Sequence, residues 1–263
     1  MPFYCGVPHI QGTSQGAKVP WSSRFPENPI LICIPGRWAA SRFPGKLGRP
    51  AGAGTVFEKA CATALDADLG PVIAVVDDDR LEQLAERAGA RCVRVDDDVG
   101  SGWARIALAH RRGLLGPAAP DDLLVNLQAD AIGATAACLR GAVDALSTPG
   151  VTLGTVAVPT PRALAGGRTT VALAGPRALY FSRHPLPADR DADAAPVLVH
   201  IGVYAARAAA LQRVLALPEG PLERAERLEQ LRWLEHGEAV GVRILEGPHS
   251  LGASVDRPGD LSP

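Results

Sequence analysis

The chain has 263 residues, of which 47% are hydrophobic and 21% are charged, and this ordinary composition excludes a chain that is disordered throughout. The 27 basic and 28 acidic side chains give a formal net charge of -1, which provides no general attraction to nucleic acid or to an acidic membrane. No apolar run approaches the roughly 20 residues that cross a bilayer, and the 5 scattered cysteines form no C-x-x-C pair. We therefore expect a cytoplasmic protein with no nucleic-acid or membrane partner.

The first half of the chain alternates between strands and helices. Residues 1–29 are rich in Gly, Pro and Ser, show no period, and are interpreted as a loose N-terminal extension. The folded part begins at a wholly apolar strand, which Pro35-Gly36 ends. The predicted elements are strands over 30–34, 72–76, 92–95 and 123–127 and helices over 55–66, 80–88, 101–115 and 135–146. This alternation of apolar strands with helices predicts an α/β fold with a doubly wound, mostly parallel sheet.

The second half is richer in strands. Strands are predicted over 151–158, 171–173, 179–182, 197–204 and 240–245. One long helix is predicted over 221–236, because the apolar side chains Leu222, Ala225, Leu228, Leu231 and Leu234 share one face of it.

Polar side chains follow three of the predicted strands. Ligands of open parallel sheets bind beyond the carboxyl ends of the strands, so the loops after 30–34, 72–76 and 123–127 are expected to line one crevice. These loops carry Arg37, Ser41, Arg42, Lys46, Asp77, Gln128 and Asp130.

The first of these loops, 35–46, holds 3 cations, 2 glycines and a hydroxyl within 12 residues. Glycine lets backbone N–H groups approach phosphate oxygens closely, and Arg and Lys neutralise phosphate charge. The spacing is not that of a P-loop. Residue types alone favour a phosphate site and an ordinary charged surface loop equally.

Two aspartates are candidate metal ligands. Asp130 directly follows a buried strand, where a carboxylate can hold Mg²⁺ together with substrate phosphates or can cap the next helix. Taken alone, capping is the favoured role. Asp256 is a candidate second ligand. His200 lies in a strand-like run, where a buried structural histidine is the favoured interpretation.

The loop sequence I-P-G-R-W-A-A-S-R-F-P-G-K over 34–46 resembles the nucleotide loop I-P-A-R-Y-x-S-[ST]-R-L-P-G-K of the CMP-Kdo synthetases (3-deoxy-manno-octulosonate cytidylyltransferases). Further matches follow in the family's order: V-N-L-Q-A-D at 125–130, A-L-Y-F-S-R-H-P-L-P at 178–187, H-I-G-V-Y at 200–204, P-L-E at 221–223, L-E-Q-L-R at 228–232 and V-D-R-P-G-D-L at 255–261. The resemblance covers 30–261. It implies a single domain of the nucleotidyltransferase (Rossmann-like) type, whose strand-rich half serves dimerisation and acceptor binding.

The family transfers CMP from CTP to an acidic sugar with Mg²⁺ and releases pyrophosphate. The resemblance therefore implies CTP and a small acidic acceptor as substrates, Mg²⁺ as cofactor and a homodimer. The residues implied to bind the nucleotide are Pro35, Gly36, Arg37, Ser41, Lys46, Asp77, Ser101 and Gly102. Those implied to bind the acceptor, whose carboxylate would want Arg and His donors, are Arg42, Gln128, Arg183, His200, Tyr204, Glu229 and Gln230. The implied catalytic groups are Arg37, Arg42, Lys46 and Asp130, and the implied metal ligands are Asp130 and Asp256.

The chain departs from the family pattern around the expected pockets. The family's S-G-T-[DE]-R is S-G-W-A-R at 101–105, and its Q-G-D-E-P is Q-A-D-A-I at 128–132. Two acceptors therefore stay open: a Kdo-like keto-acid sugar, or a phosphonate such as phosphonoformate, which relatives in phosphonate antibiotic pathways activate as a CMP conjugate. Two alternatives to this activity are an inactive relative that binds a nucleotide or a partner protein, and an enzyme specific for another base.

Overall fold

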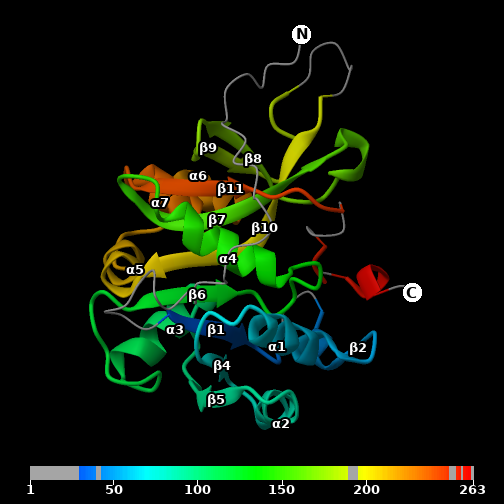
Figure 1. Ribbon diagram of the computed structural model, residues 1–263, viewed down its shortest axis with the longest axis vertical. Coiled ribbons are helices and arrows are strands. Elements are labelled where there is room, and N and C mark those ends of the chain that lie inside the picture. Colours follow the sequence, from blue (N-terminus) through cyan, green and yellow to red (C-terminus); the bar gives the residue numbers. More distant parts are fainter. Residues whose placement is uncertain (1–29, 40–42, 189–194, 249–252, 256, 262–263) are drawn as a thin grey trace, which may run out of the picture.

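A computed structural model describes residues 30–39, 43–188, 195–248, 253–255 and 257–261, so the expected extension over 1–29 lies outside it. Its main sheet has nine strands in the order β5-β4-β1-β6-β10-β7-β11-β9-β8 (Figure 1). The strands are β1 (Ile30–Gly36), β4 (Val72–Val76), β5 (Arg91–Arg94), β6 (Leu123–Leu127), β7 (Val151–Thr160), β8 (Thr170–Ala174), β9 (Arg177–Ser182), β10 (Val197–Arg207) and β11 (Ala239–Ile244). A separate small sheet pairs β2 (Pro50–Ala51) with β3 (Gly54–Thr55).

Helices cover both faces of the sheet. The α-helices are α1 (Val56–Asp66), α2 (Asp79–Arg87), α3 (Gly102–Arg111), α4 (Ala136–Ala145), α5 (Ala208–Leu215), α6 (Pro221–Glu226) and α7 (Leu231–Glu235). Short 3-10 turns are η2 (Lys46–Gly48), η3 (Arg162–Leu164) and η5 (Pro258–Leu261). None of the helices in the described part of the chain has the length and hydropathy needed to cross a membrane.

The two sets of helices build two hydrophobic cores from alternate residues of the same strands. Ile30, Ile32 and Ile34 of β1 pack into the core that α1, α2 and α4 also form. Leu31 and Cys33 of the same strand pack into the core of α3, α5 and α7. Because successive strand residues point to opposite faces, β1 must be apolar throughout. The predicted doubly wound α/β fold is confirmed.

Parallel and antiparallel pairing divide the sheet at β6. Strands β5, β4, β1 and β6 are parallel neighbours. Strand β10 then runs antiparallel to both β6 and β7, and β8 and β9 form an antiparallel hairpin, whereas β7 and β11 are parallel. Strand β8 also pairs with β10, so the strands β10, β7, β11, β9 and β8 close into a ring at the upper end of Figure 1. This ring is the strand-rich half expected from the sequence.

The prediction of a single helix over 221–236 is wrong. The structure has two short helices, α6 and α7, and Arg227 between them takes the left-handed conformation with φ 53° and ψ 49°. The expected apolar face is not buried as a unit either, because Leu222 is exposed while Glu223 is buried and ion-paired with Arg232. A left-handed residue cannot continue a right-handed helix, so the chain turns at this point.

Two other helices differ from expectation. Helix α3 ends at Arg111, four residues before the predicted end, and Gly113 follows with φ 67°, a conformation that glycine adopts at little cost. Helix α5 was not predicted. It follows β10 without an intervening loop, so the apolar run of the strand passes directly into the apolar face of the helix.

Gly154 of β7 packs directly beneath α4. A Cβ at this position would lie 2.1 Å from the carbonyl oxygen of Ala142, so the helix would have to move away from the sheet. We expect Gly154→Ala to lower the free energy of unfolding by about 1–3 kcal/mol, as overpacking of a core does. Urea unfolding measures this change. Gly166→Ala is the control, because nothing lies within 4 Å of its added Cβ, and an equal loss in both variants would contradict the packing argument.

Candidate active site

A cavity of about 530 Å³ opens at the carboxyl ends of β1 and β6. Its walls come from the loop after β1, the start of α3, the loop after β6, strand β10, the turn between α6 and α7 and the segment 253–254. The predicted site residues that line it are Pro35, Arg37, Lys46, Gly102, Gln128, Asp130, Arg183, His200, Tyr204, Glu229 and Gln230.

Three predicted residues that the structure describes, Gly36, Asp77 and Ser101, are not among the residues that line this cavity. Three more, Ser41, Arg42 and Asp256, lie outside the described residues, so their predicted roles stay predictions. The cavity also has lining residues that the sequence analysis did not single out: Phe43, Leu47, Arg168, Thr169, Arg227 and Ser254. Arg227 escaped notice because it was placed inside the predicted helix.

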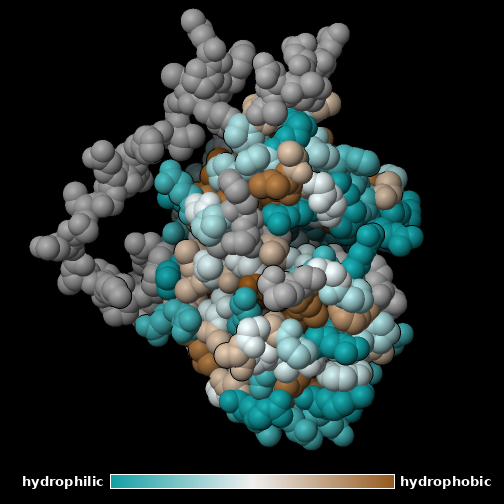
Figure 2. All heavy atoms as spheres, turned by 90° about the vertical axis from the view of Figure 1, so that its right-hand side faces the viewer, coloured by the Kyte–Doolittle hydropathy of each residue, from teal (hydrophilic) through white to brown (hydrophobic). Residues whose placement is uncertain are grey.

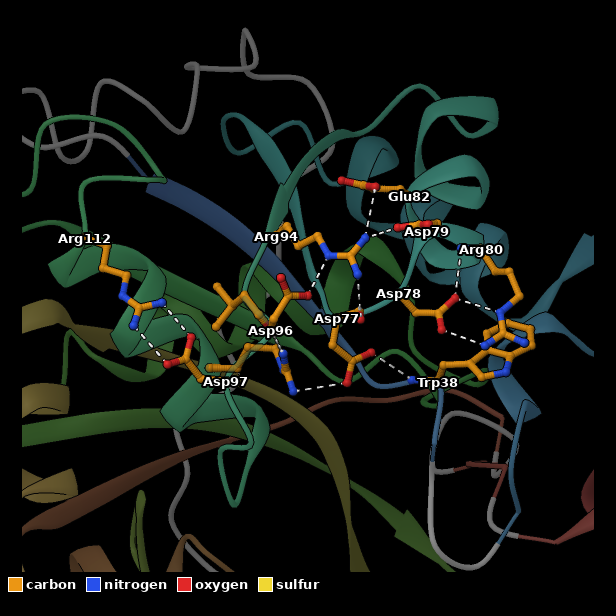
Figure 3. Close-up of polar contacts among 12 residues, drawn as sticks. Trp38, Asp77, Asp78, Asp79, Arg80, Glu82, Arg94, Asp96, Asp97 and Arg112 are labelled. Atoms are coloured by element: carbon orange, nitrogen blue, oxygen red, sulfur yellow. Dashed lines mark hydrogen bonds and ion pairs between the residues drawn. The ribbon is translucent and has the colours of Figure 1, made fainter.

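Asp77, which directly follows β4, holds the loop after β1 in position (Figure 3). Its Oδ1 accepts a hydrogen bond from the backbone N–H of Trp38 at 3.1 Å, and its Oδ2 lies 3.3 Å from Nη2 of Arg105. Arg105 is buried and also donates to the carbonyl of Val95. Both carboxylate oxygens of Asp77 therefore have protein partners. The geometry gives this residue the task of positioning the loop, and a contact with nucleotide stays a prediction.

The outer side of the same loop is fixed by a stacked arginine. The Arg80 guanidinium lies 4.1 Å from the ring centroid of Trp38 and makes two hydrogen bonds to Asp78, at 2.7 and 2.6 Å (Figure 3). Hydrogen bonds from Arg80 lower the pKa of Asp78 to about 2, so the pair stays ionised at neutral pH. The lower end of the molecule, where α2 and β5 lie in Figure 1, is covered by hydrophilic side chains in Figure 2.

Arg37 is held by a partner that an anion can replace. Its Nη2 lies 3.0 Å from Oδ1 of Asp98, and the side chains of Arg37 and Asp98 are 49% and 85% exposed. Exposed ion pairs of this kind contribute little to stability, about 0–1 kcal/mol. Arg37 can therefore turn toward a phosphate at the mouth of the cavity at small cost.

Lys46 joins three distant segments at the floor of the cavity. Its ammonium group donates to Oδ2 of Asp130, after β6, and to the carbonyl oxygen of Val255 at 2.8 Å. The backbone N–H of Val255 in turn donates to the carbonyl of Asp130 at 3.0 Å. Lys46 and Asp130 are only 13% and 24% exposed, so their ion pair is better shielded from water than that of Arg37.

The oxygen atoms that bind Lys46 are of a kind that suits Mg²⁺. A cationic ammonium stands between a carboxylate and a carbonyl oxygen, and hard oxygen donors of this kind are the ligands that Mg²⁺ prefers. Within the ranges that the structure describes, no group of three or more His, Cys, Asp or Glu side chains could hold a metal ion. Mg²⁺ commonly binds through one or two carboxylates plus substrate phosphates, so Asp130 and a triphosphate fit it.

Gly102 allows the start of α3 to approach the loop after β1. A Cβ on Gly102 would lie 2.8 Å from Cγ of Pro35. The preceding residue, Ser101, caps the helix by accepting from the backbone N–H of Ala104 at 3.1 Å. Its hydroxyl donates to the carboxylate of Glu229 across the cavity edge. Ser101 thus connects the two halves of the cavity wall.

Arg183 fixes the turn between α6 and α7. Its Nε donates to the carbonyl of Glu226 at 2.9 Å and its Nη2 to the carbonyl of Arg227 at 3.2 Å. These bonds hold the left-handed turn that brings Glu229 and Gln230 to the cavity.

Aromatic side chains form the wall beside Gln230. The Tyr204 hydroxyl donates to Oε1 of Gln230 at 3.4 Å, and burial raises the pKa of Tyr204, which keeps this hydroxyl protonated. Trp103 is buried against Tyr204 with ring centroids 6.3 Å apart. It stands where the resemblance places a small polar residue, so this wall is more apolar than the family pattern implies.

His200 of β10 is buried at the same wall. Its Nε2 lies 2.9 Å from Oγ1 of Thr155, and its ring packs edge-on against Phe181 at 5.3 Å between centroids. Burial lowers the pKa of His200 to about 3, so the imidazole is neutral at physiological pH.

Glu229 is a carboxyl whose ionisation the fold opposes. Burial raises the pKa of Glu229 to about 7, although the hydrogen bond from Ser101 acts in the opposite direction. Above its unfolded pKa of about 4.5, the folded protein holds this proton more tightly than the unfolded chain does. Stability from this group is therefore fully present below about pH 4.5 and is lost as the pH rises through about 7.

We expect Glu229→Gln to remove this loss. Urea unfolding between about pH 5 and about pH 8 should show a smaller fall in stability for Glu229→Gln than for the unmodified protein. Replacement of the exposed Glu246 by glutamine is the matched control and should leave the slope unchanged. Identical slopes in all three proteins would contradict the raised pKa.

Comparison with known proteins agrees with this geometry. A family model described as cytidylyltransferase matches residues 31–240. A 3-deoxy-manno-octulosonate cytidylyltransferase of Xanthomonas euvesicatoria is 36% identical over 248 residues, covering 88% of this chain and 93% of the relative. A protein of the same name from Methylococcus capsulatus is 35% identical and covers 88% of this chain and 94% of its own length.

Solved structures are also similar to this chain. CMP:2-keto-3-deoxy-manno-octonic acid synthetase complexed with CTP superposes with a TM-score of 0.77 at 29% identity, over 89% of this chain and 95% of the other. A 4-diphosphocytidyl-2C-methyl-D-erythritol synthase from Anaerococcus prevotii superposes with a TM-score of 0.56 at 14% identity, over 89% of this chain and 95% of the other, which shows a shared fold alone.

Proposed function

The chain belongs to the cytidylyltransferase family and is an enzyme, a nucleotidyltransferase, and we propose that it transfers CMP from CTP to a small acidic acceptor with release of pyrophosphate. One observation carries the proposal. The fold brings Arg37, Lys46 and Asp130 to one cavity, although 84 residues separate Lys46 from Asp130. An inactive relative would have no need for two phosphate cations and a carboxylate in one place.

The proposed reaction breaks the bond between the α-phosphorus of CTP and the oxygen that bridges to the β-phosphate. An oxygen of the acceptor forms the new bond to the α-phosphorus, and pyrophosphate leaves with the bridging oxygen. Such displacement is accelerated chiefly by positioning and by neutralising phosphate charge. Arg37 and Lys46 supply positive charge for the triphosphate, and Asp77 holds the loop that presents Arg37.

Mg²⁺ is proposed as the cofactor. When bound, it would neutralise phosphate charge and polarise the α-phosphate. Among the described residues Asp130 would hold it, and Asp256 is proposed as the second ligand. Lys46 would then exchange its bond to Asp130 for the phosphates of CTP.

The acceptor is proposed to lie against Gln128, Arg183, His200, Tyr204 and the 229–230 turn. Keto-acid sugars of the Kdo type are favoured by the names of the relatives that align over most of the chain. A phosphonate such as phosphonoformate is the second candidate. The indole of Trp103 favours it, because a bulky side chain leaves less room for a sugar.

A homodimer formed through the strand-rich half is also proposed. Leu179 of β9 is 61% exposed, and Leu164 of η3 is 53% exposed, which leaves apolar area on this half for a second copy to cover. Light scattering should give the mass of two chains, and the mass of one chain would contradict the proposal.

Pyrophosphate release tests the proposed activity. The assay contains CTP, Mg²⁺ and one acceptor at a time, namely 3-deoxy-manno-octulosonate, related keto-acid sugars, phosphonoformate or simple phosphonates. Replacing CTP by UTP, ATP or GTP tests the selectivity for the base. We expect release with CTP and one class of acceptor. If no combination releases pyrophosphate, and calorimetry detects no CTP binding, the proposed function is wrong.

A further inference from the structure

The direction of one hydrogen bond follows from the atoms around Thr155. A threonine hydroxyl carries a single hydrogen. Oγ1 of Thr155 lies 2.7 Å from the carbonyl oxygen of Val203, which can only accept, so the hydroxyl donates there. At its contact with Nε2 of His200, 2.9 Å away, Oγ1 must therefore accept. The proton of the neutral imidazole is on Nε2, and Nδ1 carries a lone pair.

A β-bulge sets up this arrangement. Opposite two successive residues of β7, the register of β10 passes from Ile201 to Tyr204, which leaves Gly202 and Val203 as extra residues. The Val203 carbonyl is then bonded by the Thr155 side chain at the bulge. Bulges commonly redirect side chains beside functional sites. Thr155 is completely buried, so water does not compete for its hydroxyl.

The surroundings of His200 keep this tautomer. The ring lies between Phe181, at 5.3 Å, and Tyr204, at 5.1 Å, and burial makes its protonation unfavourable. Among the described residues, the side-chain hydrogen bond of His200 is the one that Nε2 makes, and the residue lines the cavity. The expectation that His200 donates to an acceptor carboxylate therefore conflicts with the structure, because Thr155 takes its one N–H.

We propose that Nδ1 of His200 is a hydrogen-bond acceptor in the acceptor subsite and that it selects substrates that present a hydroxyl group. This inference rests on the proposed function and decides between its two acceptors. A hydroxylated keto-acid sugar can donate an O–H to this lone pair. A fully ionised phosphonate without a hydroxyl offers only oxygen lone pairs, which an unprotonated nitrogen repels.

Nitrogen NMR of the full-length protein with isotope-labelled histidine tests the protonation state. The spectrum should show the Nε2–H tautomer for His200, with an unprotonated Nδ1 that does not titrate between about pH 5 and about pH 8. His200→Asn assigns the signal. A proton on Nδ1, or titration near the ordinary pKa of about 6.5, would overturn the proposal.

Thr155→Val tests the selection of hydroxylated acceptors. It removes the hydroxyl that fixes the tautomer of His200, and Thr155 is not among the residues that line the cavity. With 3-deoxy-manno-octulosonate, KM for this acceptor should rise about 5-fold to 10-fold, the loss expected for one hydrogen bond, with kcat and KM for CTP little changed. The NMR spectrum of this variant should show a mixture of tautomers. Thr160→Val is the matched control, since Thr160 is also buried in β7 and its hydroxyl donates to the carbonyl of Val158, away from His200.

Comparing kcat/KM for the two acceptor classes tests the role of His200 separately from the proposed CMP transfer. In the unmodified protein, at a pH above the last pKa of the phosphonate, phosphonoformate should be at least about 10-fold poorer in kcat/KM than the hydroxylated acid. Preferred transfer to phosphonoformate would overturn the inference and support the proposed function. Absence of transfer to every acceptor would contradict the proposed function, and the NMR spectrum would still decide the state of His200.

Discussion

Asp130→Asn is expected to lower the rate of CMP transfer by about 10³-fold or more while the protein stays folded. Asp130 is the carboxylate that meets Lys46 at the floor of the cavity, and asparagine keeps its shape while removing its charge. Without that charge, the Lys46 ammonium loses its ion-pair partner and a magnesium ion would lose one of its proposed carboxylate ligands. Steady-state kinetics with CTP and the best acceptor measure the loss, and circular dichroism measures the fold.

Asp121→Asn is the matched control for this experiment. Asp121 is exposed and precedes β6, so it lies at the opposite end of the strand that Asp130 follows. We expect this variant to retain full activity. A folded Asp130→Asn protein with nearly full activity would remove Asp130 from the catalytic groups and from the magnesium site.

Lys46→Met is expected to raise KM for CTP and to lower kcat/KM by about 100-fold to 1000-fold, because one preorganised charge on a transferring phosphate is commonly worth that much. Methionine keeps most of the length of the side chain and removes its charge. KM for the acceptor should change much less, because the acceptor is proposed to lie toward β10. Initial-rate kinetics with each substrate varied separately measure the two constants.

Lys59→Met supplies the comparison for Lys46. Lys59 is exposed on α1, and the chain has lysines at only two positions besides it, Lys18 and Lys46. The control should behave like the unmodified protein. Equal KM values for CTP in the Lys46→Met variant and in the control would show that Lys46 does not meet the triphosphate.

The parallel half of the fold could be predicted because its strands are buried on both faces. Ile30, Ile32 and Ile34 enter one core and Leu31 and Cys33 the other, so an uninterrupted apolar run was the correct signal. The position of the cavity followed from the same topology, since polar side chains at the carboxyl ends of β1 and β6 meet there.

The turn between α6 and α7 could not be predicted from local periodicity. The apolar pattern of 221–236 favours a helix, but Arg183, which lies more than 40 residues earlier in the chain, binds the carbonyls of Glu226 and Arg227 and holds the turn. Such long-range contacts override helix propensity. This turn is what brings Glu229 and Gln230 into the cavity.

The contacts of Asp77 and the protonation of His200 could not be predicted from the sequence for similar reasons. The contacts of Asp77 with the backbone of Trp38 and with Arg105, which position the loop after β1, gave no signal in the sequence, and its contact with a nucleotide stays a prediction. The proton of His200 is placed by Thr155, a residue 45 positions away that no motif singled out. Motifs identified which side chains gather at the cavity, whereas the direction of their hydrogen bonds depends on partners elsewhere in the fold.

Labelled CTP shows which phosphate of the nucleotide the enzyme transfers. CTP labelled at the α-phosphorus, and in a parallel reaction CTP labelled at the γ-phosphorus, is incubated with the enzyme, Mg²⁺ and the acceptor that supports pyrophosphate release. We expect the α-label to appear in a CMP-acceptor conjugate and the γ-label in pyrophosphate. An α-label that stays in CDP, with the γ-label in the acceptor or in free phosphate, would contradict the proposed CMP transfer.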